Sequence, residues 1–159
     1  QALQLFGRPT WLSADLAAMR DGALIDDYFT CTLGYDRLRV VLHATTLAAE
    51  PAPRWTVHGT EGTLTIAGLD PQEAAIRDGT MPGGAGWGLG APDATLTTSQ
   101  GRTTVPQLPG DYREYYAQLR DAIRDGALPP VTAAQARDVM WLLRLGARSS
   151  ADGRRIALD

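Results

Sequence analysis

Lysine is absent from the 159-residue chain, so all fifteen of its basic residues are arginines. This absence excludes any reaction that proceeds through a neutral lysine amine or a lysine Schiff base. Eighteen acidic residues bring the net charge to −3, which supplies no positive field for nucleic acid. We therefore expect no nucleic-acid partner.

Cysteine and histidine are also scarce: the chain has one cysteine, Cys31, and two histidines, His43 and His58. A single cysteine cannot form an internal disulfide, and a lone thiol is typical of the reducing cytoplasm, where we expect the protein to be located. Three such residues, far apart in sequence, make a poor ligand set, so no metal site is expected. We interpret the histidines as hydrogen-bonded strand residues and Cys31 as a small buried side chain.

Long apolar runs are absent as well, which excludes a membrane-spanning helix of roughly 20 residues. The length suits a single domain over residues 1–159. The opening segment, QALQLFG, is typical of the end of a helix, with Gly7 closing it. Because the chain also lacks an initiating methionine, we expect it to be cut from a longer protein.

The segment Gly86–Ala91, GWGLGA, matches the loose G-x-G-x-x-A form of a dinucleotide-binding fingerprint. That fingerprint requires a buried strand before it and a helix after it. Loop-forming residues precede this segment, and Pro92 follows it and disfavours a helix. We interpret residues 83–90 as a glycine loop and leave open whether it orders on ligand binding.

Hydrophobic periodicity predicts strands first and helices later. Period-2 alternation indicates strands over residues 10–20, 28–35, 37–47 and 154–158, with hairpins over 54–68 and 94–105, the second turning at Gln100-Gly101. Helical spacing with caps predicts helices over 70–79, 111–126 and 132–147. This order favours an α+β fold, in which helices pack on one face of an open, largely antiparallel sheet.

Two of the predicted helices carry detailed expectations. In the first, Asp70 is the expected N-cap, Pro71 the first helical residue and Glu73 the partner in a capping box. In the last, Thr132 and Gln135 are expected to form a capping box, and one apolar stripe is expected to face the sheet; the stripe comprises Ala136, Val139, Met140, Leu143 and Ala147. The outer face of the third strand mixes polar residues with Val41, which predicts at least a dimer through the sheet face.

These segments, in this order, resemble the C-terminal domain of the Gfo/Idh/MocA oxidoreductase family. The resemblance rests on QALQLFG, RVVLHATTLAAEPAPRWTVHGTEGTLTIAGLDPQE, LPGDYREYYAQLRDAI, PPVTAAQARDVMWLL and GRRIAL, which span nearly the whole chain. The HGTEGTL hairpin with GLDPQE is its most specific part, and it is most similar to the scyllo-inositol dehydrogenase-like members.

The resemblance implies that the full protein pairs an N-terminal Rossmann domain, which binds NAD or NADP, with this domain. This half would shape the pocket for a sugar or polyol and support a homo-oligomer. The family's Glu-Lys-Pro lysine, and the Asp and His just upstream of QALQLFG, have no counterpart here. We therefore expect the isolated chain to bind no cofactor and to be inactive, because it lacks the acid/base groups.

Tyr112 and Trp87 are the candidate substrate-binding residues. The resemblance implies that a tyrosine at the start of this helix approaches the substrate, and a phenol can hydrogen-bond a sugar hydroxyl. An equal alternative is that Tyr112 only heads an apolar stripe with Tyr115 and Tyr116. Trp87 lies on the glycine loop, where it covers a ligand or anchors the loop.

Two other functional classes remain open from the sequence. The chain could be a free-standing ligand-binding or protein-interaction module that has no enzymatic activity. It could also be an enzyme complete in itself, although we find no acid/base cluster that would support one.

Overall fold

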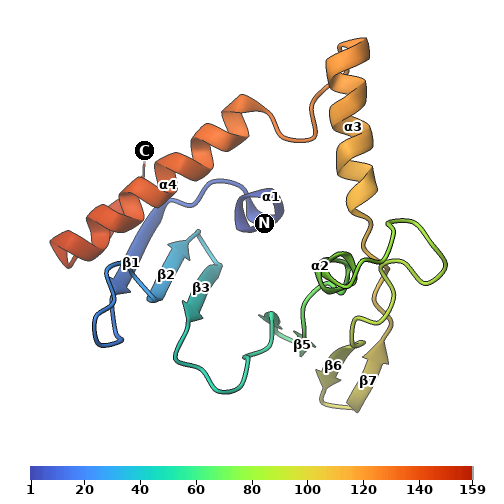
Figure 1. Ribbon diagram of the computed structural model, residues 1–159. Helices are drawn as coiled ribbons and strands as arrows, with labels where there is room; N and C mark the ends of the chain where they lie inside the picture. Colours follow the sequence, from blue (N-terminus) through green and yellow to red (C-terminus); the bar gives the residue numbers. More distant parts are fainter. Residues whose placement is uncertain (159) are drawn as a thin grey trace. The chain divides into compact units, whose positions relative to one another are not determined.

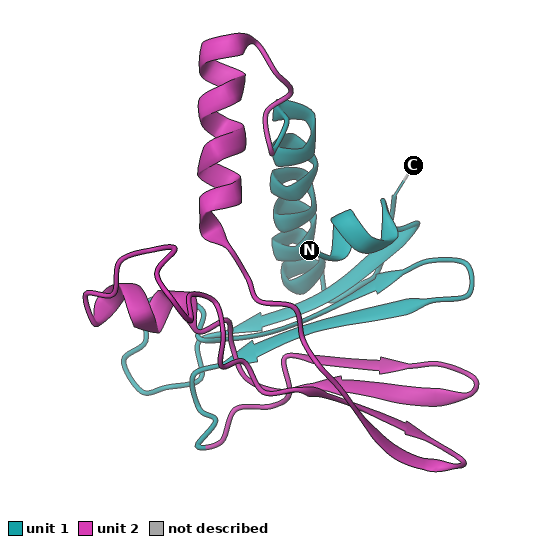
Figure 2. Cartoon of the chain, turned by 90° about the vertical axis from the view of Figure 1, so that its right-hand side faces the viewer, with its two compact units in different colours: residues 1–49, 131–159 teal, residues 50–130 magenta. Residues whose placement is uncertain are grey.

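A computed structural model describes residues 1–158, which form two compact units: residues 1–49 with 131–158, and residues 50–130 (Figure 2). Each unit contains one four-stranded sheet, and every strand pair within the sheets is antiparallel. The α+β class and the open antiparallel sheets are therefore confirmed. The strands divide into two sheets rather than one, because no strand of the first unit pairs with a strand of the second in the described residues.

The first unit contains the sheet with strand order β3-β2-β1-β8. Its strands are β1 (Trp11–Ala17), β2 (Tyr28–Gly34), β3 (Arg39–Thr45) and the two-residue β8 (Ile156–Ala157). Helix α1 (Ala2–Phe6) precedes the sheet, and Gly7 ends that helix with φ +70°. Figure 1 shows α1 and the first three strands in blue to teal, with the C-terminal helix in orange to red. The predicted strand over 154–158 is thus shorter than expected, although the Leu158 amide still donates to the Thr10 carbonyl.

Register places Leu12, Leu33 and Val40 in one cross-strand row, and Leu12 and Leu33 are buried there. Helix α4 (Ala133–Asp152) packs on this face of β1. A Cβ on Gly146 would lie 3.8 Å from the Ala14 Cβ, which shows how closely the helix approaches the strand. The small residues Gly146 and Ser149 are the buried residues of α4.

This packing corrects the predicted core stripe of α4. All five residues of that stripe, Ala136, Val139, Met140, Leu143 and Ala147, are exposed. Counting 100° of rotation per residue, the centre of this stripe lies about 100° around the helix from Gly146 and Ser149, so the two sets occupy adjacent faces. The capping box at Thr132 and Gln135, by contrast, is confirmed.

The hydroxyls of Ser149 and Ser150 serve as hydrogen-bond partners for the edge of β1. β8 pairs only with Trp11 and Leu12. Beyond that point, the Ala14 amide donates to Ser149 Oγ at 3.0 Å and the Leu16 amide donates to Ser150 Oγ at 2.9 Å. Side chains of a helix thus continue the pairing where the neighbouring strand stops.

The second unit contains the sheet with strand order β4-β5-β6-β7. β4 (Trp55–His58) and β5 (Gly62–Ile66) form the first predicted hairpin, and Trp55 faces Ile66 while Val57 faces Leu64, as expected. β6 (Ala94–Thr98) and β7 (Gly101–Val105) form the second. Its turn lies at residues 99–100, one residue earlier than predicted, because Gly101 already pairs with Thr98.

Two helices of this unit begin close to one another in space. α2 (Gln72–Arg77) and α3 (Tyr112–Asp125) are joined through the Gln72 side chain, which bonds the Tyr112 amide. Asp111 caps α3, and Gly126, where the helix was predicted to end, adopts the left-handed conformation. The glycine-rich segment 80–92 lies between α2 and β6 as turns and loop.

The start of α2 differs from its prediction in two respects: Pro71 and not Asp70 is the N-cap, and the expected capping box is absent. Asp70 does accept a hydrogen bond from an α2 amide, that of Gln72, and Pro71 has helical dihedral angles. Glu73, however, does not close a capping box; it accepts a hydrogen bond from Arg77 at 2.8 Å instead. The i,i+4 arginine competes for the carboxylate, and the Gln72 side chain bonds Asp70 in addition.

Candidate functional site

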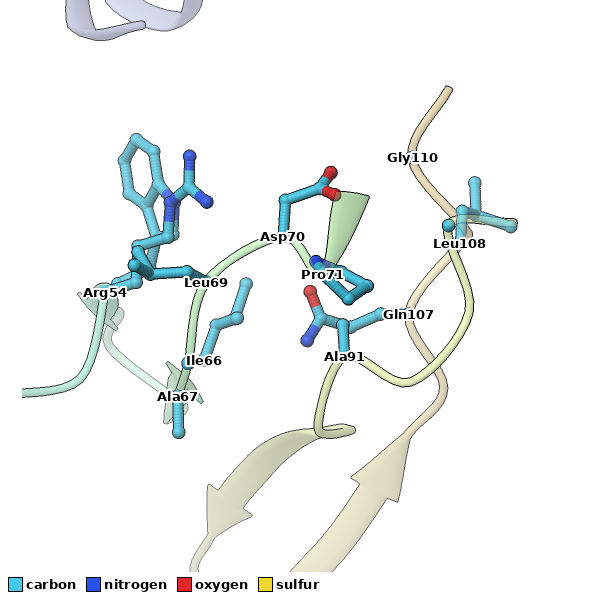
Figure 3. A pocket seen from close by; sticks show the side chains of 13 residues that line it. Arg54, Ile66, Ala67, Leu69, Asp70, Pro71, Ala91, Gln107, Leu108 and Gly110 are labelled. Carbon is cyan, nitrogen blue, oxygen red and sulfur yellow. The ribbon is translucent and has the colours of Figure 1, made fainter. Parts of the chain in front are cut away.

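The candidate site is a hollow of about 150 Å³ in the second unit. Figure 3 shows Arg54 and Leu69 at one side of it and Gln107, Leu108 and Gly110 at the other, with Asp70 and Pro71 between them. The remaining lining residues are Trp55, Ile66, Ala67, Gly68, Gly88 and Ala91. The wall is therefore built from the end of the first hairpin, the start of α2, the glycine loop and the segment before α3.

The polar groups of the hollow are of several kinds. Arg54 supplies a guanidinium, Asp70 a carboxylate, and Gln107 an amide whose Nε2 donates to the Pro92 carbonyl. Trp55 adds a half-buried indole. Together these groups offer hydrogen-bond donors, acceptors and an aromatic surface, the combination that a small polyhydroxylated molecule requires.

Behind the hollow, Gln72 is fully buried and its polar atoms are paired. Its Nε2 lies 3.0 Å from each carboxylate oxygen of Asp70, and its Oε1 accepts from the Tyr112 amide at 2.8 Å. A Cβ on Gly110 would overlap the Asp70 carboxylate and lie 2.6 Å from Gln72 Nε2. Glycine at position 110 is what allows these groups to approach.

Tyr112, one candidate from the sequence, is the first residue of α3 and 42% exposed. Its ring is not part of the hollow's lining, but the preceding Gly110 is. Its amide is held by Gln72, while Asp111 accepts from the Arg113 amide. The structure thus places Tyr112 beside the hollow, on a well-capped helix start.

Trp87, the second candidate, lies on the glycine loop against the same helix start. A Cβ on Gly83 would overlap the Arg113 guanidinium, and one on Gly88 would overlap the Gly110 carbonyl. The Trp87 Nε1 is buried and makes no hydrogen bond of normal geometry within the described residues. The pKa of Asp111 is lowered, chiefly because Arg113 donates to its carboxylate and to a small extent because of the nearby Trp87 indole.

The structure therefore brings the glycine loop and the start of α3 together. Their association is not visible in the sequence, and neither are the positions of Arg54, Asp70 and Gln107 around one hollow. Of these three, Asp70 gave a sequence signal, but as the expected N-cap of a helix and not as part of a hollow. Gly88 and Gly110 were detectable only as glycines, because the close backbone approach that they permit joins residues far apart in the chain.

The glycine loop does not fit a pyrophosphate. Residues 86–91 follow turns rather than a strand and precede Pro92 rather than a helix, and Gly88 packs against the Gly110 backbone. The amides of a helix N-terminus, which bind phosphate in nucleotide folds, are not presented by this loop. The loop is a part of the wall of the hollow.

The cysteine and the histidines lie in the sheets, as interpreted from the sequence. Burial raises the pKa of the Cys31 thiol, which disfavours the reactive thiolate. His43 lies within hydrogen-bond distance of Thr30 and the Phe29 carbonyl, and His58 of Thr63. Residues 1–158 contain no group of three or more His, Cys, Asp or Glu side chains arranged to hold a metal ion. Among the same residues, no helix has both the length and the apolarity to cross a bilayer.

Comparisons with known proteins find matches that cover nearly the whole chain. Residues 1–158 match the profile of the oxidoreductase family, C-terminal alpha/beta domain. The oxidoreductase YdgJ of Escherichia coli K12 is 42% identical over 94% of this chain and 44% of its own length. The scyllo-inositol 2-dehydrogenase (NADP(+)) IolW of Bacillus subtilis 168 is 34% identical over 100% of this chain and 46% of its own length.

A solved structure agrees with this similarity. An oxidoreductase from Yersinia pestis superimposes with a TM-score of 0.93 at 41% identity, over 99% of this chain and 46% of that one. The chain thus spans slightly less than half the length of the relatives that it matches. By its sequence profile and its structure, the chain belongs to the Gfo/Idh/MocA oxidoreductase family and corresponds to the family's C-terminal alpha/beta domain.

Proposed function

We propose that this chain is the substrate-side domain of an NAD(P)-dependent oxidoreductase that acts on a sugar or polyol. The observation that carries the proposal is the family match over residues 1–158, together with relatives about twice as long. The substrate class is supported by the similarity to IolW, which is named for scyllo-inositol and NADP(+). A cytoplasmic location is part of the same proposal.

The cofactor would be bound by the preceding half of the polypeptide, a Rossmann domain. Two observations support this division. The glycine loop is not built as a phosphate cradle, and the chain has no lysine to serve as an acid/base group. The reaction would move a hydride at a ring carbon of the substrate, with the acid/base groups supplied by the other half.

This chain's own residues would bind and orient the substrate. Tyr112 would donate a hydrogen bond to a ring hydroxyl, and Trp87 would close the site from the glycine loop. In the adjoining hollow, Asp70 accepts and Arg54 donates, so both kinds of hydroxyl interaction are available. A wall of this type fixes the position of the reacting carbon, which is the protein's main contribution in a cofactor enzyme.

The division of labour is tested by titrating NADH and NADPH into the 159-residue chain by calorimetry. We expect no saturable binding to the chain, and micromolar binding to the longer polypeptide encoded by an upstream extension of the reading frame. The longer polypeptide should also oxidise scyllo-inositol or a related polyol. Saturable micromolar binding by the 159-residue chain would contradict the assignment.

We also infer that the chain forms a homo-oligomer, at least a dimer, through the outer face of the first unit's sheet. This face is opposite α4, and it includes Ser13, Thr32 and Val41 in one cross-strand row. Val41 is 61% exposed there. Apolar area covered by a partner contributes about 25 cal/mol per Å² before the costs of association, so a second copy would gain by covering it.

A further inference from the structure

Gln72 is the best-buried polar side chain of the second unit, and its hydrogen bonds join the start of α2 to the start of α3. It is 0% exposed, and its nearest partners are Asp70, in the same turn, and Tyr112, 40 residues away. Buried amides are retained where both their donor and acceptor groups are satisfied, as here. These hydrogen bonds hold both Asp70 and Tyr112 in place.

Asp70 is one of the residues that the pairing fixes. Its Oδ1 accepts from both the Gln72 amide, at 2.9 Å, and Gln72 Nε2. Its Oδ2 also lies 3.0 Å from Gln72 Nε2. Asp70 lines the hollow, so the rotation of its carboxylate there is set by Gln72.

The N-terminal end of α3 is the second group that the Gln72 hydrogen bonds fix. Tyr112 occupies the first helical position, whose amide has no partner within the helix. Gln72 Oε1 supplies that partner at 2.8 Å, while Asp111 supplies the next. Gly110, between the hollow and Tyr112, leaves room for both contacts.

We propose that Gln72 is a positioning residue of the substrate site: it holds the Asp70 carboxylate and the Tyr112 end of α3 in a fixed relation and so sets the affinity for a polyol. This inference rests on the proposed function. An amide is required because Asp70 needs a donor and Tyr112 needs an acceptor. Leucine supplies neither, and glutamate sets a second carboxylate against Asp70.

The first test uses the 159-residue chain and needs no substrate. Hydrogen exchange of the Tyr112 amide is compared in the parent, in Gln72→Leu and in the control Gln118→Leu, which makes the same change at an exposed position of α3. We expect exchange at Tyr112 to accelerate at least tenfold in Gln72→Leu and to remain unchanged in the control. Unchanged exchange in Gln72→Leu would overturn the proposal.

The second test uses the longer polypeptide, with scyllo-inositol and NADP+ as probes. We expect Gln72→Leu to raise the KM for scyllo-inositol by about ten- to a hundredfold, because misplacement of about 1 Å has effects of that size. The KM for NADP+, and kcat per folded molecule, should stay within about threefold. Loss of folded protein alone would lower the rate without changing either KM, so it is distinguished from positioning.

Gln72→Glu gives a variant in which the defect should be reversible. At pH 7 the glutamate faces Asp70, with Asp111 and its partner Arg113 the other charged groups at the head of α3. At about pH 5, one shared proton would restore a donor toward Asp70, since paired carboxylates titrate at raised pH. We expect the ratio of the variant's KM to the parent's to fall on acidification, whereas the ratio for Gln72→Leu should not.

The two proposals fail in different ways. If the longer polypeptide binds no polyol, the proposed substrate class is wrong, and with it the role of Gln72 in polyol affinity. If it turns over scyllo-inositol but Gln72→Leu leaves that KM unchanged, the proposed function stands and Gln72 has only a structural role.

Discussion

At the scale of single residues, the most informative side chains are small or polar ones that satisfy backbone groups of another element. Ser149 is 1% exposed; it accepts from the Ala14 amide and donates to the Arg154 carbonyl at 2.7 Å. Asp27 accepts hydrogen bonds from the Met19 and Arg20 amides. Buried groups of this kind cost more when left unpaired than they contribute when paired.

Replacing Ser149 with alanine should lower the free energy of unfolding by about 1–3 kcal/mol, because the Ala14 amide loses its buried acceptor. Urea unfolding followed by circular dichroism measures this difference. Ser13→Ala, on the outer face of the same strand, is the matched control and should change stability by less than about 0.5 kcal/mol. Equal effects of the two substitutions would argue against the edge contact.

Asp27 should make stability depend on pH in the acid range. Its pKa is lowered, first by the hydrogen bond from the Met19 amide and then by the one from the Arg20 side chain. A lowered folded-state pKa contributes stability above the unfolded-state value, about 4, and that contribution is lost as the pH falls through the folded-state value.

The measurement is the melting temperature of the parent and of Asp27→Asn as a function of pH. The parent should be more stable at pH 7, and the difference should shrink below about pH 4. Asp26→Asn, at the exposed neighbouring position, should show no such convergence. A constant difference between the parent and Asp27→Asn across the range would contradict the expectation.

Residue-level predictions from the sequence succeeded where the cause was local. The end of α3 at Gly126 and the capping box at Thr132 follow from local sequence signals, and both are confirmed. Gln72 could not be identified as a link to Tyr112, because nothing in a sequence reports a contact over 40 residues. The roles of Tyr112 and Trp87 in substrate binding remain predictions.

At the scale of elements, α4 shows why an apolar stripe is an incomplete guide to packing. Its larger apolar residues, such as Met140 and Leu143, were expected to face the sheet but are exposed. The strand instead meets Gly146 and Ser149, because a close helix–strand approach, with serine hydroxyls bonding strand amides, needs small side chains. The half-buried Leu142 and Leu145 lie on the same face as these small residues, so the helix has a second apolar stripe, and that one packs.

Substitutions at Gly146 should test how closely α4 packs on β1. Gly146→Ala places a Cβ in ordinary contact with Ala14 and should stabilise the chain by up to about 1 kcal/mol, through helix propensity. Gly146→Leu should destabilise it by about 1–3 kcal/mol, because it overpacks the contact. Denaturant unfolding gives both values, with Ala147→Leu on the exposed side as a near-neutral control. A stable Gly146→Leu variant would show that α4 is not closely packed.

At the scale of the whole molecule, the family and the fold class could be predicted from the sequence. The segments that resemble the family occur in the same order and cover nearly the whole chain. The α+β class follows from periodicity, which depends only on neighbouring residues. The division of the strands into two sheets was not predicted, since strand partners far apart in sequence are selected by packing. The hollow was missed for the same reason: its walls come from residues 54 to 110.

The proposed dimer provides a prediction at this scale. Sedimentation velocity at tens of micromolar should show at least a dimer, and Val41→Glu should shift it toward monomer, because a two-fold interface brings the new charge in twice. Val139→Glu, at an exposed site on α4, should leave the sedimentation coefficient unchanged. A monomeric parent at these concentrations would contradict the sheet-face interface.

The serine contacts along β1 also determine how the first unit's sheet can grow. Unpaired amides on an outer strand are templates for aggregation, in which a foreign strand adds to the sheet. Ser149 and Ser150 occupy the amides of Ala14 and Leu16, so that route is blocked on the β1 side without an additional strand. Fibril-like extension along this part of β1 is therefore blocked, and loss of either hydroxyl would expose an unpaired strand amide there.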